Sequence, residues 1–246
     1  MTHQALADAL ELLRDKGLQQ GLGPMPPALP SGQPELDQAL RTGGWPRGSL
    51  ALLDGSGATT LALGSLAACQ QRGGLVAWID GDASFDPATA ARLGVRLEWL
   101  LVVRPHDAAE AVELAAWLAR AGTIDAFVLD LGRFEAGRGL DRLPALLARA
   151  GGVGLLLARD RDAAGRAASV RVALERRAWL AVGRDLVGQR VAATVVRHRW
   201  ALAGGRAELD LFFAEGRRVD RLLREAAAPL EEQRVEQLPA LRVVGA

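Results

Sequence analysis

The sequence predicts an α/β domain with a mainly parallel sheet flanked by helices and an antiparallel extension of that sheet. Two observations support this fold class. From residue 49 onward, short apolar runs typical of buried strands alternate with amphipathic stretches typical of helices. Beyond residue 168, longer strand-like runs follow one another instead. The chain has 246 residues, of which 50% are hydrophobic, and this is enough to bury one large core.

Two segments precede the alternating pattern. Residues 1–21 are predicted to form an N-terminal helical arm, because Leu6, Leu10 and Leu13 share one helical face. Residues 22–34 are rich in proline and are predicted to form an extended linker. Such an arm can dock onto a partner or pack back onto its own core, and both interpretations stay open.

The core is predicted to span residues 35–213. Strands and helices are expected in turn at residues 50–54, 60–71, 76–80, 87–93, 108–121, 126–130, 140–150 and 153–158. The antiparallel extension is expected to comprise strands at 170–180, 190–200 and 207–213, with a glycine turn before the last one. Residues 214–246 are predicted to be a C-terminal tail or a loosely held helix.

Composition excludes several classes of function. A formal net charge of +1 argues against indiscriminate nucleic-acid binding, and no apolar run reaches the length of about 18 residues that crosses a bilayer. We therefore expect a cytoplasmic protein with no membrane contact. Cys69 is the only cysteine and the three histidines are scattered, so neither a disulfide nor a metal site is expected. The six tryptophans are expected mostly in the core, with Trp200 as the one most exposed.

A glycine-rich segment follows the first predicted core strand and precedes a predicted helix. Phosphate-binding loops at such a place carry Gly, four residues, Gly, Lys and then Ser or Thr. Here the segment holds Gly55, Gly57, Ala58, Thr59 and Thr60, so the second glycine and the threonines are in place. Alanine takes the lysine position, and a single residue separates the two glycines.

Both departures weaken phosphate binding. The absent lysine removes charge-assisted hydrogen bonds worth about 1.5–3 kcal/mol each. The shorter loop removes several amide donors together, and Asp54 adds a negative charge beside it. We therefore expect a degenerate nucleotide site with no catalytic residue and no cofactor. Weak anion binding at the helix start near Thr59 stays open.

Most of the chain resembles the core of the RecA recombinase family, a P-loop NTPase fold. The resemblance runs from residue 29 to residue 213, and its motifs have the order and spacing of that family. The matching motifs lie at residues 29–32, 36–40, 43–48, 79–87, 93–95 and 125–130. The resemblance implies a RecA-like core.

The same resemblance implies roles for four residues. Asp130 matches the Walker B carboxylate, which orders the magnesium ion in an active enzyme. Asp82 stands where the family has its catalytic glutamate. Arg197 and Arg199 match two lysines that reach across a filament interface to the neighbouring subunit's ATP. From the residues alone, Asp130 is interpreted instead as a strand-end carboxylate that caps nearby amides, and the two arginines as part of an exposed strand face.

The sequence also differs from RecA in ways that limit what the resemblance implies about function. The segments that carry long DNA-binding loops in RecA are short here, which argues against a sequence-independent DNA grip. A RecA-like core with a degenerate nucleotide site and a tethered helical arm resembles the ImuA family, also labelled SulA-like. That resemblance implies a degenerate RecA paralogue without enzymatic activity that binds RecA or the polymerase-related ImuB, or both, in SOS mutagenesis.

Two alternatives to this function stay open. The first is an ATPase whose site is completed by arginines of a partner. The second is a DNA-binding accessory protein that uses an arginine face for weak, salt-sensitive contact, which would associate it with the nucleoid.

Overall fold

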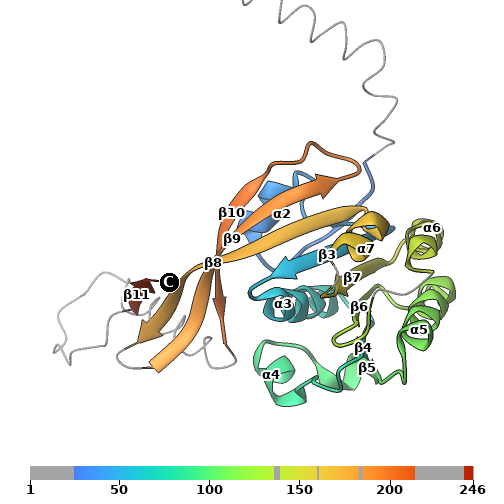
Figure 1. Cartoon of the computed structure of the whole chain (residues 1–246), viewed down its shortest axis with the longest axis horizontal. Helices are drawn as coiled ribbons and strands as arrows, with labels where there is room; N and C mark the ends of the chain where they lie inside the picture. Colours follow the sequence, from blue (N-terminus) through green and yellow to red (C-terminus); the bar gives the residue numbers. More distant parts are fainter. Residues whose placement is uncertain (1–24, 136–138, 160, 183–184, 214–240, 246) are drawn as a thin grey trace, which may run out of the picture.

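The computed structural model describes residues 25–135, 139–159, 161–182, 185–213 and 241–245 (Figure 1). Nine strands form one sheet in the order β10-β9-β8-β3-β7-β6-β4-β5, and β11 also pairs with β8. The strands are β3 (Ser49–Gly55), β4 (Val76–Asp80), β5 (Leu100–Val103), β6 (Ala126–Asp130), β7 (Val153–Leu157), β8 (Val170–Val182), β9 (Asp185–His198), β10 (Arg206–Phe212) and β11 (Leu241–Gly245). The helices are α2 (Pro34–Leu40), α3 (Ala58–Gln71), α4 (Pro87–Arg92), α5 (Ala108–Ala121), α6 (Leu143–Ala150) and α7 (Arg161–Ala167).

In the parallel part of the sheet, β3, β4, β6 and β7 are buried on both faces, as continuous apolar strands require, whereas the edge strand β5 is partly exposed. Strands β3, β7, β6, β4 and β5 pair in parallel, and β3 also pairs in parallel with β8. Alternate strand residues enter two separate cores. One core packs under α2, α3 and α4, and the other packs under α5, α6 and α7. The predicted fold class is confirmed.

The antiparallel extension is a long hairpin that continues beyond the body of the sheet (Figure 1). β8 pairs with β3 as far as the Gly55–Leu174 pair. It then continues to Val182, and residues 178–182 of this distal part pair with β11. β9 begins at Asp185 rather than at residue 190. The beginning of this strand was not predicted because the polar residues Gln189 and Arg190 interrupt the apolar pattern. Register shifts between β8 and β9 also interrupt the alternation of apolar and polar side chains.

Several elements lack a strong periodic pattern and were not predicted. They are β1 (Ala28–Leu29), β2 (Trp45–Pro46), α2, β5, α7, β11 and a short 3-10 turn, η2 (Leu97–Trp99). The helix expected at 140–150 begins with a second 3-10 turn, η3 (Leu140–Arg142), before α6. Ala28–Leu29, inside the range expected as a linker, pairs with Trp45–Pro46. The segment expected as a tail contributes β11, which completes the distal hairpin. Leu6, Leu10 and Leu13 of the expected arm lie outside the described residues.

The tryptophans divide between core and surface. Trp45 and Trp78 are fully buried, and Trp200 is half-buried, so the prediction that Trp200 is the most exposed is wrong. Trp99 and Trp117 are exposed instead. Cys69 is buried, and burial raises the pKa of its thiol to about 11. Among the described residues, no helix is both long and apolar enough to span a bilayer.

Candidate functional site

The candidate site lies where β3 ends and α3 begins. β3 is buried along its length until Gly55, its last residue. Gly55 and Gly57 have φ angles of 111° and 84°, which favour glycine, and Gly57 is the N-cap of α3. No side chain caps this helix start. The glycines therefore serve to reverse the chain within a very short turn.

The turn closes directly against β8. The amide of Ser56 donates a hydrogen bond of 3.1 Å to the carbonyl oxygen of Leu174. Any Cβ on Gly55 would overlap the same oxygen, and a Cβ on Gly57 would lie 2.5 Å from Cδ1 of Leu211. An amide that could face a phosphate is thus used within the fold. The side chains of Gln189 on β9 and Leu211 on β10 lie close to Gly57.

The first turn of α3 carries no cation. Ala58, at the lysine position, is half-buried and packs against the core under α3. Thr59 is exposed and Thr60 is half-buried at the rim of a cleft of about 800 Å³ between α2, α3 and β10. Both residues lie in the first turn of α3, where the phosphate-binding motif carries Ser or Thr. The residues at this turn do not fit a triphosphate, because the loop that would surround it is closed.

Asp54, just before the turn, belongs to a buried ion pair. Its side chain is 7% exposed, and Oδ2 lies 3.1 Å from a guanidinium nitrogen of Arg171 on β8. The negative charge expected beside the loop is therefore compensated by the neighbouring strand.

Three carboxylates gather at the carboxyl ends of β4 and β6. Asp80 and Asp130 end adjacent, paired strands, and Asp82 follows β4. Oδ1 of Asp130 accepts the amide of Gly132 at 3.0 Å. The pKa of Asp130 is raised to about 6, mainly by burial; the hydrogen bond from Gly132 lowers it, and the nearby charges of Asp80 and Asp82 contribute to raising it.

The other two carboxylates are held by local donors. Asp80 is fully buried and accepts the amides of Ser84 and Phe85. Asp82 accepts the amide of Arg133 at 2.6 Å, and its other oxygen lies 3.5 Å from a guanidinium nitrogen of Arg159. Sequence reasoning did not single out Asp80, although its position at a buried strand end, two residues before Asp82, was the available signal. Within the described ranges, no cluster of His, Cys, Asp and Glu fits a metal ion.

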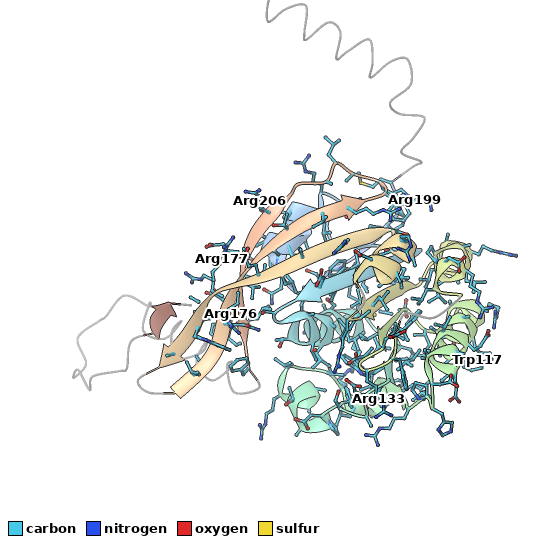
Figure 2. The ribbon with its side chains drawn as sticks, in the orientation of Figure 1. Trp117, Arg133, Arg176, Arg177, Arg199 and Arg206 are labelled. Atoms are coloured by element: carbon cyan, nitrogen blue, oxygen red, sulfur yellow. The ribbon has the colours of Figure 1, made fainter. Side chains whose placement is uncertain are left out.

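Arg197 and Arg199 lie far along β9 and beyond it, away from the closed turn. Arg197 donates a hydrogen bond of 2.9 Å to the carbonyl oxygen of Gly165, near the end of α7. The guanidinium of Arg199, labelled in Figure 2, lies 5.4 Å from the ring centre of Trp200. Together with Arg166, both line a cleft of about 350 Å³. The structure thus groups the two arginines with each other but not with Asp82 and Asp130.

A parallel sheet whose first strand passes through a glycine turn into a helix, beside acidic strand ends, places the protein in the RecA-like class of α/β domains. Residues 25–133 match the family model of the RecA N-terminal domain. The chain is 32% identical to Protein RecA of Thermus thermophilus, over 87% of this chain and 77% of the relative. It is 31% identical to Protein RecA of Bacillus subtilis (strain 168), over 76% of this chain and 66% of the relative. The chain belongs to the RecA family.

Proposed function

We propose that this chain is a non-catalytic RecA-like accessory protein of the ImuA type, which binds RecA or an ImuB-like protein in the bacterial response to DNA damage. The observation that carries the proposal is the closed turn at residues 55–57. Its Ser56 amide is bonded to β8, and side chains of Leu211 and Gln189 stand against Gly57. A triphosphate would have to break these contacts before it could use the loop amides.

The rest of the RecA-like body supports a binding role. Both hydrophobic cores are buried, and nine strands form one continuous sheet within the described residues. A chain that keeps the family fold but lacks its nucleotide-binding loop still has surfaces that can bind other proteins, although the nucleotide chemistry is lost. This follows because function depends on individual sites and not on the fold itself. We therefore assign the function to protein contact in the cytoplasm.

The test separates protein binding from nucleotide binding. Calorimetric titration of the purified chain with a non-hydrolysable ATP analogue and magnesium is expected to give no binding in the micromolar range. Titrations with purified RecA and with an ImuB-like protein are expected to give saturable binding to at least one. Asp130→Asn serves as the matched variant, and it should bind the same protein with unchanged affinity.

Two results would contradict the proposal. Micromolar binding of the ATP analogue that Asp130→Asn abolishes would favour the ATPase completed by a partner. Failure to bind either protein, with normal folding by circular dichroism, would leave no support for an accessory role.

One observation favours contact with DNA as a second candidate function. Arg166, Arg197 and Arg199 line the same cleft, and exposed arginines on one face are the usual partners of phosphates. If this face binds DNA, the affinity should fall steeply as salt is raised, and Arg199→Ala should reduce the slope. A slope near zero would exclude this candidate.

A further inference from the structure

A cleft of about 800 Å³ lies between helices α2 and α3 and strand β10. Helix α2 packs beside β9 and β10 and forms one wall of this cleft (Figure 1). Its floor is the face of α3 that carries Thr60, Gly64 and Gln71. Binding sites in proteins commonly have volumes of about 300–1,000 Å³. The closed turn at residues 55–57 does not line this cleft, so the cleft stays open although the phosphate loop is closed.

The charge of the cleft is negative. Arg190 on β9 is the one cation among the described residues that line it. Asp210 on β10 neutralises this guanidinium through hydrogen bonds of 2.7 and 2.8 Å. Glu35 on α2 and Glu208 on β10 also line the cleft and are exposed, and no hydrogen bond or ion pair joins either of them to another described residue. Two uncompensated carboxylates therefore favour a cationic ligand and repel phosphates.

Aromatic side chains lie on the same wall as Glu208. Phe212 is the last residue of β10 and Phe213 follows it, and Phe213 is 37% exposed. Leu93, at the end of α4, adds a half-buried apolar side chain. An arginine side chain suits this combination, because its planar guanidinium pairs with a carboxylate and stacks on an aromatic ring.

We propose that this cleft binds an arginine-containing segment of a partner protein. Guanidinium groups of the segment pair with Glu35 and Glu208, and its apolar side chains pack against Phe213 and Leu93. The inference rests on the proposed function, which requires that the chain bind another protein, and it adds the chemistry of the bound segment.

The other candidate occupants of the cleft are less complementary to it. Nucleic acids and nucleotides would bring phosphates against the uncompensated carboxylates. Residues 1–21 of the chain itself carry more acidic side chains than basic ones, namely Asp8, Glu11 and Asp15 against Arg14 and Lys16. A basic segment of a second protein is therefore the occupant that charge complementarity favours.

Gly64 allows the floor of the cleft to be changed without changing its charge. It lies within α3, and a Cβ added there would meet no atom within 4 Å. Its φ angle is not in the left-handed region, so other residue types fit its backbone conformation. A larger side chain at this position would therefore enter the cleft without disturbing the fold.

A labelled peptide of alternating arginine and leucine tests the charge of the cleft. Fluorescence anisotropy should show that the full chain binds it with a dissociation constant on the order of ten micromolar, and binds a peptide with glutamate in place of arginine far more weakly. Combining Glu35→Lys with Glu208→Lys should raise the dissociation constant about tenfold or more and should reverse this preference. The matched control combines Glu135→Lys with Asp141→Lys, because these are exposed carboxylates outside the cleft. It should change the constant by less than about twofold.

A variant of Gly64 tests whether the peptide occupies the cleft. Gly64→Trp should weaken binding of the arginine peptide about tenfold, because the indole would fill the floor that the peptide needs. Gly64→Ala is the control, and it should keep most of the affinity. Neither variant should lower the melting temperature, since glycine is a poor helix former.

Three results would overturn the inference. The first is an equal loss of arginine-peptide binding in the charge-reversed cleft variant and in its control. The second is unchanged binding by Gly64→Trp. The third is a dimer of the wild-type chain in sedimentation equilibrium that Gly64→Trp abolishes, because the cleft would then belong to a second copy of this chain.

The peptide titrations need neither RecA nor an ImuB-like protein, so the inference and the proposed function can fail separately. Peptide binding in the cleft without binding of either protein would contradict the proposed function alone. Saturable binding of one of these proteins that the Glu35→Lys and Glu208→Lys double variant leaves unchanged would contradict the inference alone.

Discussion

Replacing Asp130 by asparagine should stabilise the protein above pH 6. The carboxyl group of Asp130 has a pKa of about 6 in the folded chain, compared with 3.8 for an ordinary aspartate. Because the folded state holds the proton more tightly than the unfolded state, ionisation of this group lowers stability as the pH rises from about 4 to 6. Asparagine is neutral at every pH, and its oxygen can still accept the Gly132 amide.

The expected size follows from the pKa difference. A shift of about two units corresponds to about 3 kcal/mol, which is an upper limit because solvent reaches part of the site. A domain of this length gains about 2–4 °C in melting temperature per kcal/mol. Asp130→Asn should therefore raise the melting temperature by several degrees at pH 8. At pH 4, where the wild-type carboxyl group is protonated, the two proteins should differ little.

Urea unfolding of both proteins at pH 4, 5, 6, 7 and 8 measures the effect. The matched control is Asp86→Asn at the N-cap of α4. Hydrogen bonds from Thr89 and Ala88 lower the pKa of the Asp86 carboxyl group. Asparagine can still cap the helix but carries no charge, so above pH 4 this variant should lose the stability that the lowered pKa of Asp86 contributes to the wild type. An Asp130→Asn protein that is no more stable than wild type at pH 8 would refute the argument.

Three further predictions concern the packing around the site. Gly55→Ala should cost more than about 2 kcal/mol in urea unfolding, because its Cβ would overlap the Leu174 carbonyl oxygen at a φ of 111°. Arg171→Met should cost about 3 kcal/mol in the same assay, since it removes the guanidinium that pairs with buried Asp54. Burial lowers the pKa of His198, so the stability that neutral His198 contributes should be lost as the pH falls below about 6.5. His198→Leu should flatten this part of the pH profile of unfolding.

The alternating part of the fold was predictable because its strands are buried on both faces. Residues such as Leu52, Ile79 and Leu129 lie in continuous apolar runs, and glycine, proline or charged residues bound each run. Strand β5 has the same apolar character but is only four residues long. It follows a proline-initiated helix and a 3-10 turn without a clear boundary, so its pattern was not separable from theirs.

The residues that form the site could be predicted from the sequence, but their tertiary contacts could not. Sequence spacing located the short turn and the missing lysine, because both are local properties of residues 55–60. The partner of Ser56 is Leu174 and that of Asp54 is Arg171, both more than a hundred positions away. No period in the sequence links such pairs. They meet because β8 returns beside β3, and only the topology of the sheet brings that about.

The position of the turn explains how the loop can be short while the fold persists. A turn at the end of a buried strand has polar backbone groups that must find partners, and an orphaned amide costs about 1–3 kcal/mol. The carbonyl oxygen of Leu174 satisfies Ser56, because β8 continues past the end of β3 instead of stopping there. The same continuation carries β8 on to its pairing with β11. The short turn and the long hairpin are thus structurally linked, because β8 supplies the Leu174 carbonyl oxygen that accepts the Ser56 amide of the closed turn.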